Sequence, residues 1–399
     1  MMTIQMGTLS QTRSLLFSCL LTALVVYTLS TRFSSPPRGF VPTSGYSPEL
    51  GRPYAEDEEV IPHGISVFKP DGYKKHLVLP RMSNEDVSWL TYLPPEMMIT
   101  PKPYIVDADL RNPPVGAMTT PINKGHEVLV YLTYIIEHYD HALPDIIIFV
   151  HAHSATWHNN DLQLASTPVM LLEMNYLRVL RHGYVNLRCH WQPGCPAWIR
   201  ANTTETDINK PEEALFRKGF QELFPGEKMP DIFSTACCAQ FAVTADTIRK
   251  HPKERYVKWR QWIIDTELED SVSGRIWEYL WQFVFPGPER LGSLEERATS
   301  CPKEHVCYCD GYGYCFGGER EYEAFMAQRR KANDLRSRLQ LAEEDTEAVM
   351  DDWRREGMDR VRAEIKELDD WCEEEAVRAR IRGKDPKMRK LELGSEFSG

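Results

Sequence analysis

The sequence predicts an α/β fold in which helices flank a central, mostly parallel sheet, followed by a charged helical C-terminal extension. Over residues 126–139 the apolar side chains recur at helical spacing, and Leu143-Pro144 ends that segment. A continuous apolar run follows over residues 145–150, which is typical of a strand buried on both faces of a sheet. A helix, a short loop and a buried strand in succession indicate α/β architecture.

The predicted α/β catalytic domain spans residues 63–286. Glycine and proline mark where its elements end, as Gly183 does at the C-cap of the helix before it. The other expected elements are a weak strand at 65–79, a strand at 104–109, a helix at 167–182, a strand at 184–188, a β-leaning segment at 231–243 and a short helix at 245–251.

The N-terminal region, residues 1–62, is predicted to be a hydrophobic anchor or signal followed by a linker. Its apolar run from Leu15 to Leu29 is shorter than the ~20 residues of a membrane span. It fits the apolar region of a signal peptide or a short signal anchor, and Ser/Pro-rich sequence follows it. We therefore expect membrane association through this segment.

The regions after the α/β domain differ from it in composition, because the first is rich in cysteine and the second in charged residues. The chain has ten cysteines, and a Cys189–Cys195 disulfide could close a tight loop. A predicted Cys-rich loop at 287–318 fits either a zinc site or two disulfides, and residues 319–399 read as a charged helical tail. The cysteines of that loop are Cys301, Cys307, Cys309 and Cys315.

A basic run threaded with aromatic residues precedes the last apolar segment of the domain. The net charge of −11 means that a nucleic-acid binder of this composition needs a local basic patch. Such cations neutralise phosphates and the rings between them stack on bases, although a solvated helix face shows the same pattern. The cations are Arg249, Lys250, Lys253, Arg255, Lys258 and Arg260.

Two further groups are candidates for chemistry. Asp265 and Glu269 would share one face if residues 259–269 form a helix, and neighbouring carboxylates raise one pKa to give a base. His151 and His153 follow the buried strand, where functional loops leave such sheets. They fit either a metal site lacking a third ligand or a pair of hydrogen-bonded pocket histidines, and no metal or other cofactor is predicted.

The segments NKGHEVLVYLTYIIEHYDHALPDIIIFVHAHSATWHN, DIFSTACCAQFAVTADTIRKHP and WIIDTELEDSVSGRIWEYLWQFVF resemble a fungal family known as a domain of unknown function. The resemblance covers roughly residues 85–285, and functionally it is similar to the arginine-containing cyclodipeptide synthases, whose DxxxE motif Asp265 and Glu269 match. It implies that arginyl-tRNA and a second aminoacyl-tRNA are condensed to a cyclic Arg-Xaa dipeptide in secondary metabolism. The domain would then face the cytosol, where charged tRNA occurs.

The resemblance also implies roles for individual residues. Asp265 and Glu269 would serve as guanidinium anchor and base, and the basic run would hold the tRNA acceptor ends. Glu278, His151 and His153 are further candidates for substrate binding.

The alternative prediction is a membrane-anchored, glycosyltransferase-like enzyme of the secretory pathway, with a glycosyltransferase-A-like sheet. The apolar N-terminal run, the linker, the cysteines and the α/β pattern favour it, as does the loop with His151 and His153, where such enzymes hold a metal and the nucleotide. The glycosylation sequon at Asn202 also fits the secretory pathway. The only Asp-x-Asp motif, at Asp107 and Asp109, precedes the expected strand end. A third interpretation is a membrane-tethered partner protein that acts through its charged tail, for which Asp265 and Glu269 would be dispensable.

Overall fold

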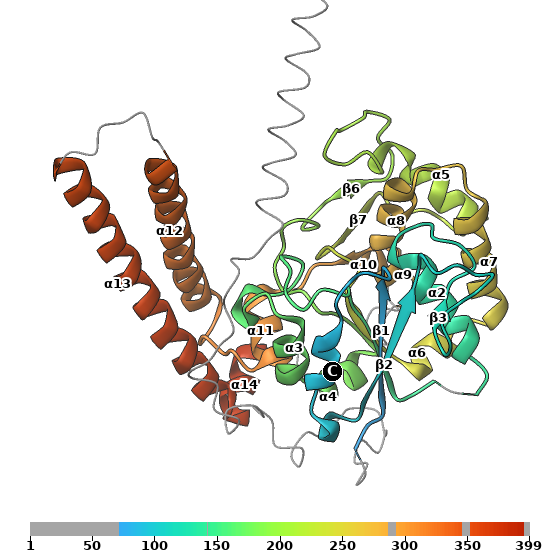
Figure 1. The fold of residues 1–399 in the computed structure, drawn as a ribbon, viewed down its shortest axis with the longest axis horizontal. Coiled ribbons are helices and arrows are strands. Elements are labelled where there is room, and N and C mark those ends of the chain that lie inside the picture. Colours follow the sequence, from blue (N-terminus) through green and yellow to red (C-terminus); the bar gives the residue numbers. More distant parts are fainter. Residues whose placement is uncertain (1–71, 142, 286–292, 345–351, 395–399) are drawn as a thin grey trace, which may run out of the picture. The chain divides into compact units, whose positions relative to one another are not determined.

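A six-stranded, mostly parallel sheet forms the centre of the protein, as predicted (Figure 1). The computed structural model describes residues 72–141, 143–285, 293–344 and 352–394, all within one compact unit, Glu49–Gly399. The strand order is β3-β2-β1-β4-β8-β5, in which β1 to β4 are parallel and β8 is antiparallel to both β4 and β5. The strands are β1 (Lys75–Arg81), β2 (Ile99–Ile105), β3 (Met118–Thr119), β4 (Ile146–Phe149), β5 (Tyr184–Asn186) and β8 (Phe241–Thr244).

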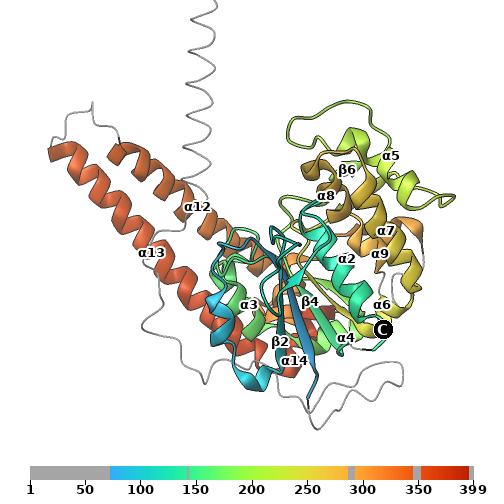
Figure 2. The ribbon, with the colours of Figure 1, turned by 45° about the vertical axis from the view of Figure 1, so that its right-hand side comes forward.

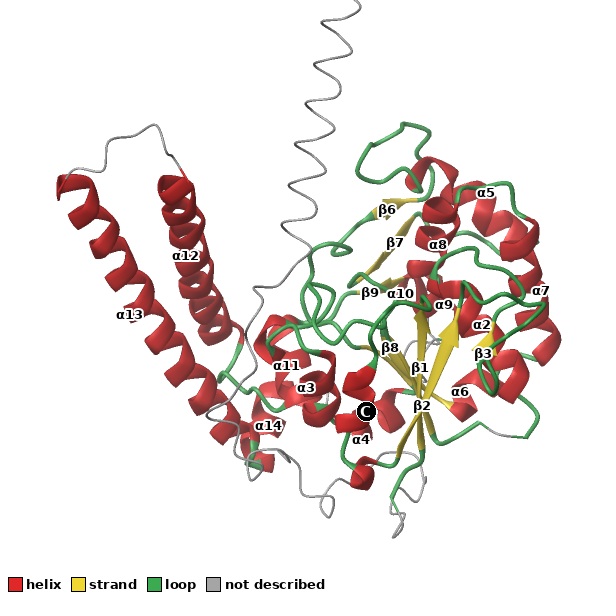
Figure 3. Ribbon diagram, in the orientation of Figure 1, coloured by secondary structure: helices red, strands yellow, loops and turns green. Residues whose placement is uncertain are grey.

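Helices cover both faces of this sheet (Figures 2 and 3). Side chains alternate between the faces along a strand, so Ile147 and Phe149 enter one hydrophobic core while Ile146 and Ile148 enter the other. The first core is covered by α2 (Glu127–His138), α5 (Glu213–Leu223), α7 (Lys253–Asp265), α8 (Asp270–Glu278) and α9 (Trp281–Val284). The second is covered by α3 (Thr167–Glu173), α4 (Tyr176–His182) and α11 (Glu304–Tyr312).

A small second sheet joins the segment after the gap at 286–292 to the main domain. Its order is β6-β7-β9, with β6 (Ile199–Arg200), β7 (Ile232–Thr235) and β9 (Thr299–Ser300). Before β9, α10 (Leu294–Ala298) begins at a capping box in which Ser293 and Glu296 bind each other's backbone N–H. The short helix α6 (Ala245–Arg249) continues from β8.

The predicted Cys-rich loop at 287–318 contains α11, which holds Cys307 and Cys309, so the prediction of a loop is wrong for this part of the segment. The predicted Cys189–Cys195 disulfide is also wrong, because each of these cysteines pairs with one that lies more than a hundred residues further along the chain. Among the described residues the disulfides are Cys189–Cys307, Cys195–Cys301, Cys237–Cys238 and Cys309–Cys315.

The C-terminal extension is helical, as predicted, and consists of α12 (Glu319–Glu344), α13 (Asp352–Gly383) and α14 (Pro386–Leu393). Helices α12 and α13 run side by side (Figures 1 and 2). Arg380 of α13 pairs with Glu173 of α3 at 2.6 Å. A Cβ on Gly383 would lie 2.0 Å from the Gly313 carbonyl oxygen, so this close approach requires glycine.

Local patterns predicted some elements well and others in part. Residues 126–139 and 145–150 are confirmed as α2 and β4, and Gly183 caps α4 with φ 71°. The predicted helix at 167–182 is two helices, because the Asn175 side chain accepts from two backbone N–H groups and starts α4.

The predicted membrane association requires correction. Within residues 72–141, 143–285, 293–344 and 352–394, no helix combines the length and apolar character that a bilayer crossing needs. This finding overturns the predicted membrane-associated localisation. The run from Leu15 to Leu29 and the linker up to residue 62 lie outside the described residues.

Candidate functional site

The loops that follow β1, β2, β4 and β5 leave one edge of the sheet, which we call the carboxyl edge. Strand β5 has the same direction as β4, because both are antiparallel to β8. The β7–β8 connection reaches this edge as well, since Phe241 at the start of β8 pairs with Phe149 at the end of β4. Ligands of open α/β sheets bind at such an edge.

Hydrogen bonds fix the loops at the carboxyl edge. The Trp89 indole N–H donates to the carbonyl of Ala152 at 2.8 Å and holds the turn after β4. The backbone N–H and hydroxyl of Ser83, after β1, both donate to the carboxylate of Asp107, after β2, at 2.7 Å. These hydrogen bonds hold the loops after β1, β2 and β4 in fixed positions relative to one another.

The two predicted histidines of this edge do not converge. The Nε2 of His151 lies 2.8 Å from the carbonyl oxygen of Cys238, so this nitrogen carries a proton and donates it. Burial lowers the pKa of His151. His153 is exposed, with its Nε2 3.5 Å from a carboxylate oxygen of Glu85.

Glu278 lies beside this loop at the C-terminal end of α8. The backbone N–H of Cys238 donates to its Oε1, so a short chain of contacts links His151, Cys238 and Glu278. The pKa of Glu278 is raised to about 7, chiefly by burial and with a contribution from the carboxylates of Glu127 and Glu212, while the Cys238 N–H acts to lower it. Part of the side chain still reaches solvent. An accessible carboxylate with a near-neutral pKa is suited to general base catalysis.

Sequence reasoning missed two side chains of the same group, Arg188 and His158. Arg188 follows β5 and is buried, and its guanidinium Nη1 lies 3.6 Å from the Cys238 Sγ. The His158 ring packs against the His151 ring, with centroids 4.7 Å apart. For Arg188, the available signal was its position at the end of the predicted strand at 184–188.

Asp265 and Glu269 do not lie on one helix, so that expectation is wrong. Helix α7 ends at Asp265, Thr266 is extended, and α8 starts after Glu269. Both carboxylates are exposed, and Asp265 accepts from the side chain of Gln261 at 2.8 Å. Glu269 and Glu278 lie at opposite ends of α8, about 13 Å apart along its axis. The catalytic role of Asp265 and Glu269 stays a prediction.

The first part of the basic run lies at the opposite edge of the sheet from His151. Helix α6, which ends at Arg249, starts directly after Thr244, and Thr244 pairs with the first residue of β4. Lys253 pairs with Asp140, which precedes β4, at 2.5 Å.

The remaining cations follow α7 away from that edge. Arg255 pairs with Glu227, and its guanidinium lies 5.0 Å from the Trp259 ring, so it has a structural role. Lys258 is exposed and Arg260 is half-buried. The structure therefore does not gather the six cations at one site.

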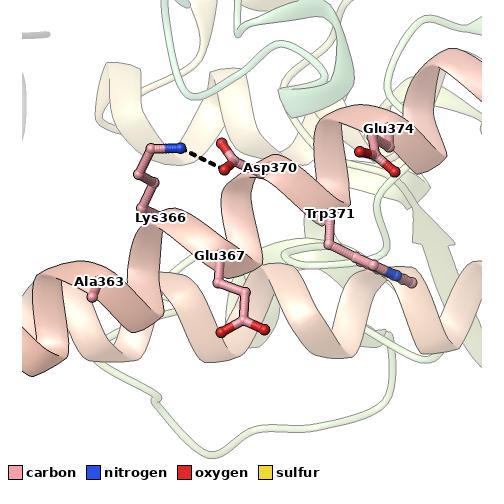
Figure 4. A pocket seen from close by; sticks show the side chains of 6 residues that line it. All are labelled: Ala363, Lys366, Glu367, Asp370, Trp371 and Glu374. Atoms are coloured by element: carbon pink, nitrogen blue, oxygen red, sulfur yellow. Dashed lines mark hydrogen bonds and ion pairs between the residues drawn. The ribbon is translucent and has the colours of Figure 1, made fainter.

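Other hollows and clusters of the described residues fit a ligand poorly. A hollow on α13 is formed by one helix face, where Lys366 and Asp370 pair at 2.5 Å (Figure 4). Glu278 and Glu392 each lie close to two cysteine sulfurs, but these sulfurs are joined in disulfides, whereas a metal binds the thiolate.

The chain belongs to the family DUF3431, described as a protein of unknown function, whose model matches residues 77–310. The match begins within β1 and ends in α11, so it includes all of the six-stranded sheet except the first two residues of β1. No curated protein and no solved structure matches the chain. The predicted resemblance to a domain of unknown function is confirmed, and nothing in the match links the chain to cyclodipeptide synthases.

Proposed function

We propose that this protein is a glycosyltransferase-like enzyme that transfers a sugar from a nucleotide-activated donor at the carboxyl edge. The observation that carries the proposal is Glu278, a half-buried carboxyl with a pKa of about 7 that binds Cys238 of the β7–β8 connection, whose carbonyl accepts from His151 of the loop after β4. Sugar transfer to a hydroxyl needs such a base close to the donor.

The sheet supports this class of enzyme. Parallel strands β1 to β4 and the reversed strand β8 form an open α/β sheet whose loops meet at the carboxyl edge, which supports binding of a nucleotide-activated donor there. The donor would lie where the loops after β1, β2 and β4 meet.

The reaction assigns a distinct task to Glu278. Its carboxylate accepts the proton of the acceptor hydroxyl while that oxygen forms a bond to the anomeric carbon of the donor. The bond from the anomeric carbon to the diphosphate oxygen breaks, and its electron pair leaves with the nucleoside diphosphate. Glu278 then releases its proton to solvent.

The disulfides favour sugar transfer over a reaction of charged tRNA. Cys189–Cys307 and Cys195–Cys301 join distant parts of the chain, and such bonds persist in oxidising compartments. Aminoacyl-tRNA is a cytosolic substrate, whereas sugar nucleotides are also used in the secretory pathway.

The test is release of nucleoside diphosphate from a panel of UDP-, GDP- and ADP-sugars by purified protein with intact disulfides. Glu278→Gln should lower turnover by about one-hundredfold or more, and Glu267→Gln, an exposed acid in the loop before α8, should leave it unchanged. Absence of turnover with every donor, or full activity of Glu278→Gln, would reject the proposal.

As a second proposal, the protein is an arginine-containing cyclodipeptide synthase. The exposure of several side chains that the resemblance assigns to catalysis and tRNA binding favours it. Asp265, Glu269 and Lys258 are all exposed, and a large tRNA substrate needs accessible groups. Mass spectrometry of extracts from a yeast host would compare the chain with Asp265→Ala/Glu269→Ala at equal expression. A new cyclic dipeptide with arginine, absent from the double variant, is expected, and its absence from well-expressed protein would end this proposal.

A further inference from the structure

Arg188 is a buried cation that makes no ion pair with the described residues. The residue is 6% exposed, and the carboxylates of Asp161, Glu278 and Glu304 act on its charge only from beyond ion-pair distance. Its Nη1 and Nη2 donate to the carbonyl oxygens of Trp157 at 2.9 Å and Gln192 at 2.7 Å, and its buried Nε has no hydrogen-bond partner. Burial of an unpaired charge is costly, and it lowers the pKa of Arg188.

The imidazole of His158 adjoins this guanidinium. Its Nδ1 is buried and also lacks a partner among the described residues. Burial, His151 and the charge of Arg188 lower the pKa of His158 to about 3. The indole of Trp157, which is 59% exposed, lies 5.2 Å from the guanidinium and borders the group on its solvent side.

A purely structural role does not account for these observations. An arginine that only ties two loops together needs the two carbonyl contacts, which a neutral donor could also make. An anion bound here would pair with the charge of Arg188. It could also form hydrogen bonds with the Nε of Arg188 and the Nδ1 of His158, which have no partners among the described residues.

A divalent cation does not fit at the position where a glycosyltransferase-A-like fold would hold one. The loop after β4 offers His151 and His153, but the Nε2 of His151 donates to a carbonyl and His153 is exposed beside Glu85. Its donors do not converge, and the cysteine sulfurs nearby form a disulfide.

We propose that Arg188, with His158, forms an anion subsite that binds the diphosphate of the donor without a metal ion. The bidentate guanidinium suits phosphate oxygens. Arg188 contacts the sulfur of Cys238, whose backbone N–H binds Glu278, so Cys238 lies between the proposed diphosphate subsite and the base. The identification of the anion as the diphosphate of a sugar donor rests on the proposed function, whereas the binding of an anion by Arg188 and His158 does not.

Isothermal titration with inorganic pyrophosphate tests this subsite directly, because it needs no turnover. We expect the native protein to bind pyrophosphate in EDTA, with no gain in affinity from added Mn²⁺. Arg188→Gln should weaken binding by about tenfold to one-hundredfold, and Arg188→Lys by less. Arg200→Gln removes an exposed cation at the end of β6 and should change the affinity by less than about twofold.

A second variant covers the case in which Arg188→Gln does not fold. His158→Gln keeps the carbonyl contacts of Arg188 and should weaken pyrophosphate binding by about threefold to tenfold. Binding that requires Mn²⁺, or equal affinities for the native protein and the folded variants, overturns the inference.

The outcomes also separate this inference from the proposed function. Pyrophosphate binding that depends on Arg188, without turnover of any sugar nucleotide, keeps the subsite and rejects the glycosyltransferase. Turnover of a sugar nucleotide with Arg188-independent binding keeps the enzyme and rejects the subsite.

Discussion

Replacing Glu278 by glutamine should stabilise the folded protein while it removes activity. In the native fold the Glu278 pKa is raised from 4.5 to about 7, so the folded state binds this proton more tightly than the unfolded chain does. The stability of the native protein therefore falls as the pH rises from about 4.5 to about 7, and it changes little above that range through this group. Glutamine is neutral at every pH and avoids this loss.

The size of the effect follows from the same shift. Because the pKa rises from 4.5 to about 7 on folding, ionisation of Glu278 lowers the unfolding free energy at pH 8 by about 3 kcal/mol relative to acidic pH, where the group is neutral in both states. The gain should be smaller, about 1–3 kcal/mol, because part of the side chain reaches solvent and the new amide N–H groups need acceptors. In melting temperature this amounts to roughly 2–8 °C.

This stabilisation can be measured by thermal unfolding at pH 4.5 and pH 8. The proteins compared are the native protein, Glu278→Gln and the control Glu267→Gln. We expect a higher melting temperature for Glu278→Gln at pH 8, a much smaller difference at pH 4.5, and no change for the exposed control. Equal gains at both pH values would refute the reasoning, because the effect would then not come from ionisation of Glu278.

Three more outcomes follow from particular contacts. Cys195→Ser/Cys301→Ser opens a loop of 106 residues and should lower the unfolding free energy by about 4–5 kcal/mol in denaturant titrations; unchanged stability would contradict this pairing. Arg329→Gln removes the ion pair between α12 and the loop after β4 and should cost about 0.5–1 kcal/mol by thermal unfolding, whereas Arg330→Gln, which pairs only within its own helix, should not. Chain secreted from a eukaryotic host should carry a glycan at the exposed Asn202 that Asn202→Gln removes in intact mass spectra, and this glycan would exclude the tRNA-dependent reaction.

Elements with a strong local pattern could be predicted from the sequence. The apolar spacing of α2 and the continuous run of β4 depend only on neighbouring residues, because these segments bury one stripe or both faces. The break between α3 and α4 escaped prediction, since Asn175 reads as an ordinary polar residue within the helical pattern although its side chain caps a new helix.

The site could be predicted in part, because His151, His153 and Glu278 were named from the sequence, whereas Arg188 was missed although it follows β5. His151 was found because it follows β4 directly. The importance of Glu278 and Arg188 depends on Cys238, which is 40 and 50 residues away in sequence. Contacts between residues so far apart in sequence produce no local spacing pattern. Asp265 and Glu269 are four residues apart and therefore stood out in the sequence, although both are exposed in the structure.

The long-range disulfides make completion of the fold depend on the last part of the domain to be synthesised. Cys189 and Cys195 lie in the loop after β5, and their partners Cys307 and Cys301 follow 118 and 106 residues later. A nascent chain leaves the ribosome from its N-terminus, so both thiols stay unpaired until the region of α11 has emerged. A chain that ended before β9 would leave the thiols of Cys189 and Cys195 without these partners and one edge of β7 unpaired. Both covalent loops can therefore close only after the chain has been translated into α11.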